Sequence, residues 1–150
     1  MNRKLKWGAI ALVLALVLAA GYSWLHVSGR EIASLAAIDE DCEVVIVRHD
    51  MMDPQGAREY TLTGLQIREL RELLEKSSYT RRLGFLDETS HDSTFYNISV
   101  YFDGRQEVLF FGCVGGDFIS VFSSFEKKDN YNLKINRKDW KGSLEKILAA

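Results

Sequence analysis

The stretch FYNISVYFDGRQEVLFF, residues 95–111, decides the fold class of this chain. Its first half carries an apolar or aromatic residue at each even position from 96 to 102, which is typical of a strand with one buried face. The Asp103-Gly104 pair suits a tight type I′ turn, because both residues tolerate positive φ angles. Residues 106–111 then return as a second strand, so the sequence predicts an antiparallel β-hairpin.

More strands are predicted on either side of this hairpin. Residues 43–49, EVVIVRH, form a β-branched run that favours a central strand buried on both faces. Gly115-Gly116-Asp117 marks a further turn. The predicted strands are residues 43–49, 57–62, 95–102, 106–111, 118–122 and 131–135. Because turn residues separate most of these runs, we expect an antiparallel sheet of about five or six strands.

Two helices are predicted to cover the sheet. Thr63 and Gln66 have the spacing of a capping box, and the residues that follow place apolar side chains on one stripe and charged side chains on the other. A second helix is expected near the C-terminus, with Asn136 as its cap and an apolar stripe that includes Leu144 and Ile147. The predicted fold class is therefore α+β, with an antiparallel sheet and two helices packed on it.

An uninterrupted apolar run, WGAIALVLALVLAAGYSWLHV, occupies residues 7–27. A run of about 20 apolar residues crosses the hydrocarbon core of a membrane as one helix. Because Arg3, Lys4 and Lys6 precede the run, the positive-inside rule places the N-terminus in the cytoplasm and the rest of the chain outside it. We expect residues 1–29 to form a cytoplasmic head and transmembrane signal anchor, residues 30–42 a stalk, and residues 43–150 an extracytoplasmic domain.

The apolar run has a second interpretation, as a cleaved signal peptide. The small residues of Leu18-Ala19-Ala20-Gly21 follow an apolar core of suitable length for cleavage, which would release a secreted domain. In contrast, Trp7, Tyr22 and Trp24 suit the two interfaces of a retained span. We therefore expect a single-pass protein of the cell membrane.

The part of the chain after the apolar run is acidic. Residues 30–150 contain all 21 acidic residues but only 16 of the 19 basic ones, because three basic residues lie in the head, and their net charge is −5. Nucleic acid attracts basic surfaces, so no nucleic-acid partner is expected. The composition does not change along this part, which predicts one domain with a core of its own.

Cys42 and Cys113 are the two cysteines of the chain. Cys42 opens one predicted strand and Cys113 closes another, so outside the cytoplasm they could form a disulfide across the sheet. The alternative is two buried thiols that pack as small apolar side chains. Neither cysteine has a second ligand at short spacing, so we expect no metal site, and we expect no cofactor.

No catalytic residues are predicted. His49 and His91 are each followed by an aspartate, but adjacent residues of a strand point to opposite faces, which separates His49 from Asp50. No serine lies in a Gly-x-Ser-x-Gly sequence. We therefore expect a protein that is not an enzyme, with an envelope hydrolase built from loop carboxylates and a histidine as the alternative.

Aromatic residues crowd the predicted strands after residue 94. Because neighbours point to opposite faces, one residue of each adjacent pair is left for the face that the helices do not cover, where an apolar patch would bind a partner. In the alternative interpretation, the terminal helix or the stalk covers this face. The predicted binding residues are Phe95, Tyr101 and Phe111, with Arg81 and Arg105 for the recognition of carboxylates or other anions.

A strand pair after Glu43, a helix that ends near Thr80-Arg81 and alternating strands with a turn at Asp103-Gly104 follow one another along the chain. This layout resembles a group of small, membrane-anchored or lipoprotein-like extracytoplasmic domains of unknown function from Gram-positive bacteria. The resemblance implies location and fold, and it implies no role for any residue.

The sequence therefore predicts a membrane-anchored binding module for a protein, a peptide or an envelope component. The envelope hydrolase is one alternative. A structural subunit of a larger membrane complex is the other.

Overall fold

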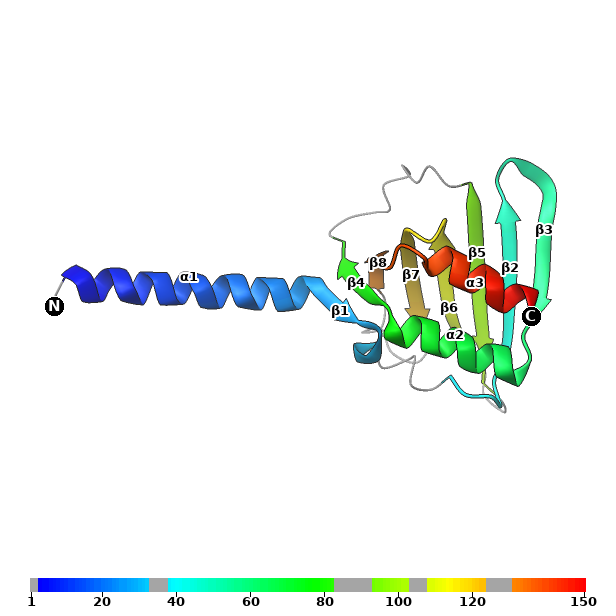
Figure 1. Cartoon of the computed structure of the whole chain (residues 1–150), viewed down its shortest axis with the longest axis horizontal. Helices are drawn as coiled ribbons and strands as arrows, with labels where there is room; N and C mark the ends of the chain where they lie inside the picture. Colours follow the sequence, from blue (N-terminus) through cyan, green and yellow to red (C-terminus); the bar gives the residue numbers. More distant parts are fainter. Residues whose placement is uncertain (1–2, 33–37, 83–92, 103–107, 124–130) are drawn as a thin grey trace.

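The computed structural model describes residues 3–32, 38–82, 93–102, 108–123 and 131–150. A long helix, α1 (Arg3–Leu25), leads into a body in which two further helices lie against a sheet (Figure 1). The helices of this body are α2 (Gly64–Lys76) and α3 (Trp140–Ala149), with a short 3-10 turn, η1, at Gly29–Glu31. The strands are β1 (His26–Ser28), β2 (Glu43–Asp50), β3 (Asp53–Thr61), β4 (Ser78–Arg81), β5 (Thr94–Tyr101), β6 (Val108–Val114), β7 (Phe118–Ser123) and β8 (Tyr131–Ile135).

The eight strands form one antiparallel sheet in the order β1-β4-β8-β7-β6-β5-β2-β3. The α+β class is therefore confirmed, but the strand count is higher than the predicted five or six. The two additional strands, β1 and β4, pair with each other at one edge. They contain three and four residues, too few for an alternating pattern to appear in the sequence.

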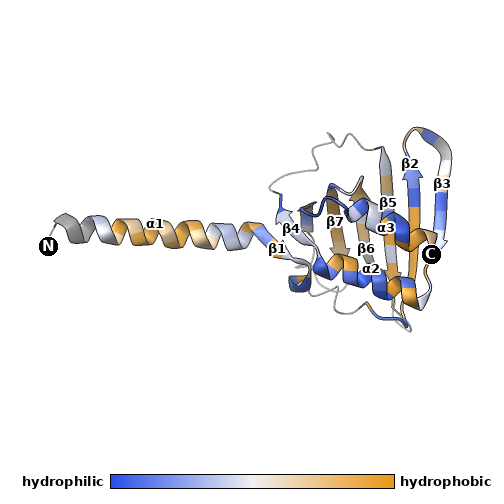
Figure 2. Cartoon of the chain, in the orientation of Figure 1, coloured by the Kyte–Doolittle hydropathy of each residue, from blue (hydrophilic) through white to orange (hydrophobic). Residues whose placement is uncertain are grey.

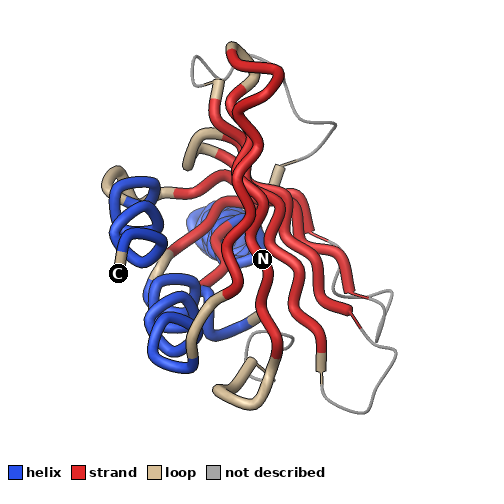
Figure 3. Tube along the Cα trace, turned by 90° about the vertical axis from the view of Figure 1, so that its right-hand side faces the viewer, coloured by secondary structure: helices blue, strands red, loops and turns tan. Residues whose placement is uncertain are grey.

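Helices α2 and α3 lie on one side of the strands (Figure 3). Thr63 caps α2 as predicted: its Oγ1 accepts from the Gln66 amide at 3.4 Å, and the Gln66 side chain accepts from the Thr63 amide at 2.9 Å. The buried residues of α2 are Ile67, Leu70, Leu73 and Leu74, and those of α3 are Trp140, Leu144, Ile147 and Leu148. These stripes bury the helix-facing side of the sheet.

Helix α3 begins later than predicted. Asn136 does not cap it, because the Asn136 amide group donates to Thr80 Oγ1 on β4 at 3.1 Å. Asp139 occupies the N-cap position without a capping hydrogen bond from its side chain, and the helix starts at Trp140. The tertiary contact of Asn136 with β4 thus replaces the local capping role that the sequence suggested.

The middle of helix α1 is apolar (Figure 2), and its side chains from Trp7 to Trp24 are exposed. Residues Trp7–Leu25 are long and apolar enough to cross a membrane, and a signal sequence has the same features. The helix ends at Leu25, two residues before the predicted end of the apolar run, because His26 and Val27 already belong to β1.

Residues 26–42 contribute to the core, whereas residues 30–42 were expected to form a stalk. Val27, Ile32, Ile38 and Cys42 are all buried. Gly29 packs on the end of α2, where its amide donates to the Ser77 carbonyl at 3.0 Å. A Cβ atom at Gly29 would lie only 2.0 Å from the Leu74 carbonyl oxygen. The folded body therefore begins at His26, immediately after α1.

Both cysteines are buried thiols. Cys42 precedes Glu43, which is opposite Tyr101 on β5, whereas Cys113 is opposite Tyr96. The five steps from Tyr96 to Tyr101 span roughly 16 Å at about 3.3 Å per residue, and a disulfide needs Cα atoms within about 7 Å. The register thus separates the two cysteines that the sequence suggested as a disulfide.

Candidate interaction surface

The sheet has one face that α2 and α3 do not cover, which we call the open face. Along β5, Ile98 and Val100 are buried beneath the helices, so Ser99 and Tyr101 point to the open face. Residues that are opposite each other on neighbouring strands point to the same face. The register therefore assigns the residues of β2, β6, β7 and β8 either to the open face or to the side that the helices cover. Apolar and aromatic residues of the open face are Val45, Val47, Phe95, Tyr101, Val114, Phe118 and Phe122, and its polar residues include Asn97, Ser120 and Asn132.

Two aromatic side chains of the open face are strongly exposed. Tyr101 on β5 is 43% exposed and Phe122 on β7 is 49% exposed. Phe95 and Phe118 on the same face are half-buried. A soluble domain usually buries large aromatic side chains, and neighbouring exposed ones are typical of contact surfaces. Among the described residues, the open face therefore presents exposed apolar and aromatic surface.

The guanidinium group of Arg82, the residue after β4, also lies at the open face. The Cζ atom of Arg82 lies 4.4 Å from the centroid of the Phe118 ring, in a cation–π arrangement. Within the described part of the chain, Arg82 Nη1 is buried and has no hydrogen-bond partner. Between the aromatic rows, Ser120 Oγ donates to Asn132 Oδ1 at 2.8 Å. The open face thus offers a cation and polar groups beside its aromatic rings.

The structure places two of the five residues predicted for this surface, Phe95 and Tyr101, on the open face, near opposite ends of β5. Phe111 was placed on the wrong face: it is fully buried beneath the helices, opposite Ile98 and Val121. Arg81 is on the same side of β4 as the buried Tyr79, with its Cζ atom 5.5 Å from the ring of Trp24 on α1. Arg105 lies outside the described residues.

The predicted binding residues did not include Phe118 and Phe122. The signal was present in residues 118–122, FISVF, where the β-branched Ile119 and Val121 alternate with the two phenylalanines. Such a pattern separates the two faces of a strand, but it does not say which face the helices cover.

The residues of the hydrolase alternative do not form a catalytic arrangement in the described part of the chain. His49 lies on the open face, with its ring centroid 6.5 Å from that of Phe95. Asp50 accepts from the Met52 amide at 3.0 Å, as in a turn. Among the described residues, no group of three or more His, Cys, Asp or Glu side chains could hold a metal ion. His91 lies outside the described residues.

A polar cluster of Arg48, Tyr96 and Glu145 lies on the helix-facing side of the sheet and connects α3 to β2 and β5. Arg48 Nε lies 2.9 Å from Oε1 of Glu145, and the Tyr96 hydroxyl donates to the same oxygen. Burial raises the pKa of Tyr96, and its hydrogen bond to Glu145 adds to the increase. Each member of the cluster contacts another member, which explains the cluster as a structural link between α3, β2 and β5.

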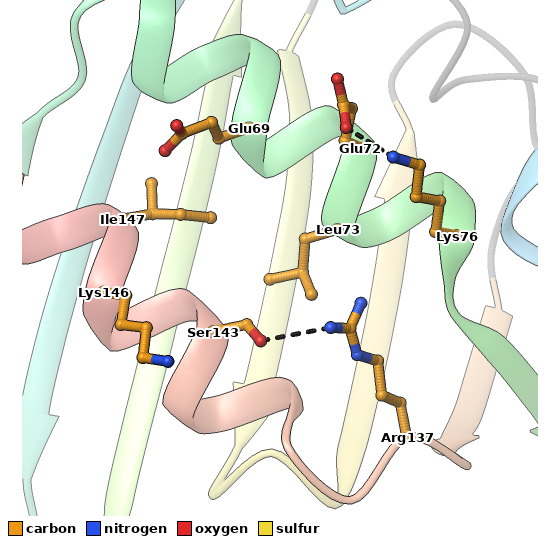
Figure 4. A pocket seen from close by; sticks show the side chains of 8 residues that line it. All are labelled: Glu69, Glu72, Leu73, Lys76, Arg137, Ser143, Lys146 and Ile147. Carbon is orange, nitrogen blue, oxygen red and sulfur yellow. Dashed lines mark hydrogen bonds and ion pairs between the residues drawn. The ribbon is translucent and has the colours of Figure 1, made fainter.

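A groove of about 310 Å³ runs between α2 and α3 (Figure 4). Its floor contains Leu73 and Ile147, and its rim is charged with both signs. Lys76 Nζ lies 2.6 Å from Glu72 Oε2, so these two charges compensate each other. The groove is a seam between two helices, and its charges do not favour a ligand of either sign.

Comparisons of the chain with protein-family models, with curated proteins and with solved structures find no match. The function is therefore argued from the geometry of the described residues.

Proposed function

We propose that this protein is a single-pass membrane protein whose domain, outside the cytoplasm, binds a protein or peptide partner through the open face. The observation that carries the proposal is the exposure of Tyr101 and Phe122 on the one sheet face that α2 and α3 leave uncovered. Aromatic side chains supply large contact area at a low cost in conformational entropy, and they dominate many binding interfaces.

The proposed anchor is α1. Its leucine and valine side chains are exposed along the helix, and an apolar surface of this length is stable in lipid but not in water. The basic residues Arg3, Lys4 and Lys6 favour a cytoplasmic N-terminus. Because β1 starts at His26, directly after the helix, the domain is held close to the membrane surface with no intervening spacer.

The anchor is tested by the intact mass of the protein recovered from membranes and by its resistance to extraction at alkaline pH. We expect the full-length mass and complete retention in the membrane fraction. A mature protein that begins at Gly21 and is released into the medium would contradict the anchor. It would leave the open face intact, because every strand begins after Gly21.

The binding surface is tested by site-specific photocrosslinking of the full-length protein in its native membrane. A photoreactive phenylalanine analogue replaces Tyr101 or Phe122, and the matched control replaces Leu65 on α2, which is 55% exposed. We expect the same crosslinked protein from positions 101 and 122 and not from position 65. Absence of a product at both positions, or the same product at position 65, would overturn the proposal.

Alanine substitution gives a second measurement. The Tyr101→Ala, Phe122→Ala double variant should lower partner recovery about tenfold or more, because truncation of a central interface aromatic costs at least about 1–2 kcal/mol and each 1.4 kcal/mol is tenfold in affinity. The Leu65→Ala control should retain the recovery of the wild type. Both variants change exposed side chains, so their unfolding midpoints should match that of the wild type.

A further inference from the structure

A second pocket, of about 320 Å³, lies at the β6–β7 turn and the connection between β8 and α3. Its lining includes four basic side chains, Lys134, Arg137, Lys138 and Lys141, and one carboxylate, that of Asp117. The four cations come from β8, from α3 and from the segment that joins them. They converge on a volume at the lower end of the range for small-molecule sites, about 300–1,000 Å³.

The partners of these cations differ. Arg137 is held by Asp139 through two contacts, at 2.9 Å from Nε and 3.1 Å from Nη2. Lys141 Nζ donates to the hydroxyl of the buried Thr94 at 3.0 Å. In the described part of the chain, Lys134 and Lys138 have no ion pair or hydrogen bond from their side chains. Two of the basic residues that line the pocket, Lys134 and Lys138, therefore carry ammonium groups that form no ion pair in the described part of the chain.

This positive charge stands out from the rest of the domain. Residues 30–150 carry a net charge of −5, and the groove between α2 and α3 has both acidic and basic side chains on its rim. Concave sites lined by one sign of charge focus the electrostatic potential and concentrate counter-ions of the opposite sign. The pocket is thus a local site of attraction for anions on an acidic domain.

One wall of the pocket is rigid. Gly115 and Gly116 adopt φ angles of 59° and 87°, which form the tight β6–β7 turn. A Cβ atom at Gly116 would lie 2.8 Å from the Cβ of Lys141, so this turn packs closely on the first turn of α3. The backbone that supports Lys141 is therefore fixed before any ligand arrives, and this preorganisation reduces the cost of binding.

The pocket lies near the anchored edge of the sheet. His26, the first residue after α1, is opposite Thr80 on β4, and Thr80 is opposite Lys134 on β8. Lys134 is therefore two strands away from His26. At a spacing of about 4.8 Å between neighbouring strands, their Cα atoms lie roughly 10 Å apart. An anion that belongs to the membrane surface or to the solution next to it is within reach of this side chain.

We propose that the pocket binds a phosphate group. Lysine ammonium groups bind phosphate as point charges, and a doubly charged anion of tetrahedral shape can accept from several cations at once. The pocket volume accommodates a phosphate with a small attached group. The source is a soluble phosphate ester or a phospholipid headgroup, and both present the same chemistry. Lys134 is opposite Phe118 of the open face, but neither Tyr101 nor Phe122 lines the pocket, so either proposal can fail alone.

The test uses the full-length protein in nanodiscs of digalactosyldiacylglycerol, a bilayer lipid without a phosphate group, with inorganic phosphate and glycerol 3-phosphate as probes. The readout is the rate at which an amine-reactive reagent labels individual lysines, measured by mass spectrometry. We expect saturable protection of Lys134 and Lys138 by the probes, while Lys76 on α2 is labelled at an unchanged rate. Chloride at equal ionic strength should give no such difference. Uniform protection of all lysines, or none, would overturn the proposal.

Charge variants provide the matched comparison. Lys134→Gln with Lys138→Gln should weaken phosphate binding, measured by calorimetry, at least about tenfold, because each substitution removes a charge-assisted contact. Lys76→Gln with Lys146→Gln makes the same charge change in the α2–α3 groove and should leave binding unchanged within about twofold. Equal weakening in both variants would show a general charge effect and would contradict a phosphate site.

A second arm distinguishes the two sources. In nanodiscs that contain phosphatidylglycerol, a lipid source predicts that Lys134 and Lys138 are protected before any soluble probe is added. A soluble source predicts the same labelling in both kinds of nanodisc, with protection only by the added ester. If neither the lipid nor the soluble probes protect these two lysines, the pocket does not bind phosphate.

Discussion

Arg48 on β2 and Glu145 on α3 meet across the helix–sheet interface, with Nε and Oε1 2.9 Å apart. They are 97 residues apart in the sequence, so their contact ties the last helix to the first long strand. The Tyr96 hydroxyl donates to the same carboxylate, and hydrogen bonding to Glu145 raises the pKa of the Arg48 guanidinium. This link holds α3 in the position that leaves the other face of the sheet uncovered.

A double-mutant cycle should measure this link. We expect Arg48→Met and Glu145→Gln to show a coupling free energy of about 1 kcal/mol, because the pair is partly buried and shares a hydrogen bond with Tyr96. The comparison is the exposed pair Glu72 and Lys76 on α2, for which a smaller coupling is expected because water screens both charges. Urea unfolding of the full-length protein in detergent gives the four free energies. Equal coupling in the two pairs would contradict the special role of Glu145.

The local part of the fold could be predicted from the sequence. The Thr63–Gln66 capping box depends on residues three positions apart, and the alternation of residues 96–102 depends on neighbours at a spacing of two. Such patterns are contained in a short segment, and their physical causes do not need the rest of the chain.

The candidate surface was predicted only in part, because its assignment depends on tertiary contacts. Alternation says that neighbouring residues such as 110 and 111 point to opposite faces, but it does not say which face α2 and α3 cover; the folded chain buries Phe111. The same holds for Arg81, the last residue of β4, and Arg82, which follows it, because β4 is too short to show a pattern in the sequence. The basic pocket joins Lys134, Lys141 and the β6–β7 turn, which only the folded chain brings together.

Alanine substitution should change the free energy of unfolding in opposite directions at Gly116 and at Gly142. Gly116 has a φ of 87° and a Cβ there would meet Lys141, so Gly116→Ala should lower the free energy of unfolding by about 1–3 kcal/mol. Gly142 lies within α3, and a Cβ there has no neighbour within 4 Å. Gly142→Ala should raise the free energy of unfolding by about 0.5–1 kcal/mol. Denaturant unfolding midpoints measure both changes. If Gly116→Ala raised the midpoint as Gly142→Ala does, the turn would tolerate a side chain.

Alkaline pH should destabilise the domain. Burial raises the pKa of the Cys113 thiol and of the Tyr79 hydroxyl, so both groups stay protonated in the folded state. In the unfolded chain they ionise near pH 8.5 and pH 10. A raised folded-state pKa contributes stability that is complete below the unfolded pKa and is lost as the pH rises above it. We therefore expect the free energy of unfolding to fall above about pH 8.5.

The contribution of Cys113 can be isolated with Cys113→Ala. Each group that ionises only in the unfolded state adds a slope of about 1.4 kcal/mol per pH unit. The variant is less stable at pH 7 because of the cavity, but its free energy of unfolding should fall less steeply than that of the wild type between about pH 8.5 and 10. Parallel curves for the two proteins over this interval would show that the thiol is not protected from ionisation.

The start of the folded body can be tested by truncation. Removal of residues 26–42 would delete β1 and the buried side chains of Val27, Ile32 and Ile38. Burial of three aliphatic side chains contributes about 1.5–3 kcal/mol each, which together is comparable with the whole stability of a domain, about 5–15 kcal/mol. A fragment of residues 43–150 should therefore show no cooperative unfolding by circular dichroism. A fragment of residues 26–150, which lacks only α1, should unfold in one cooperative transition. If the two fragments unfold with the same midpoint, residues 26–42 are a dispensable spacer and the domain does not begin at the membrane surface.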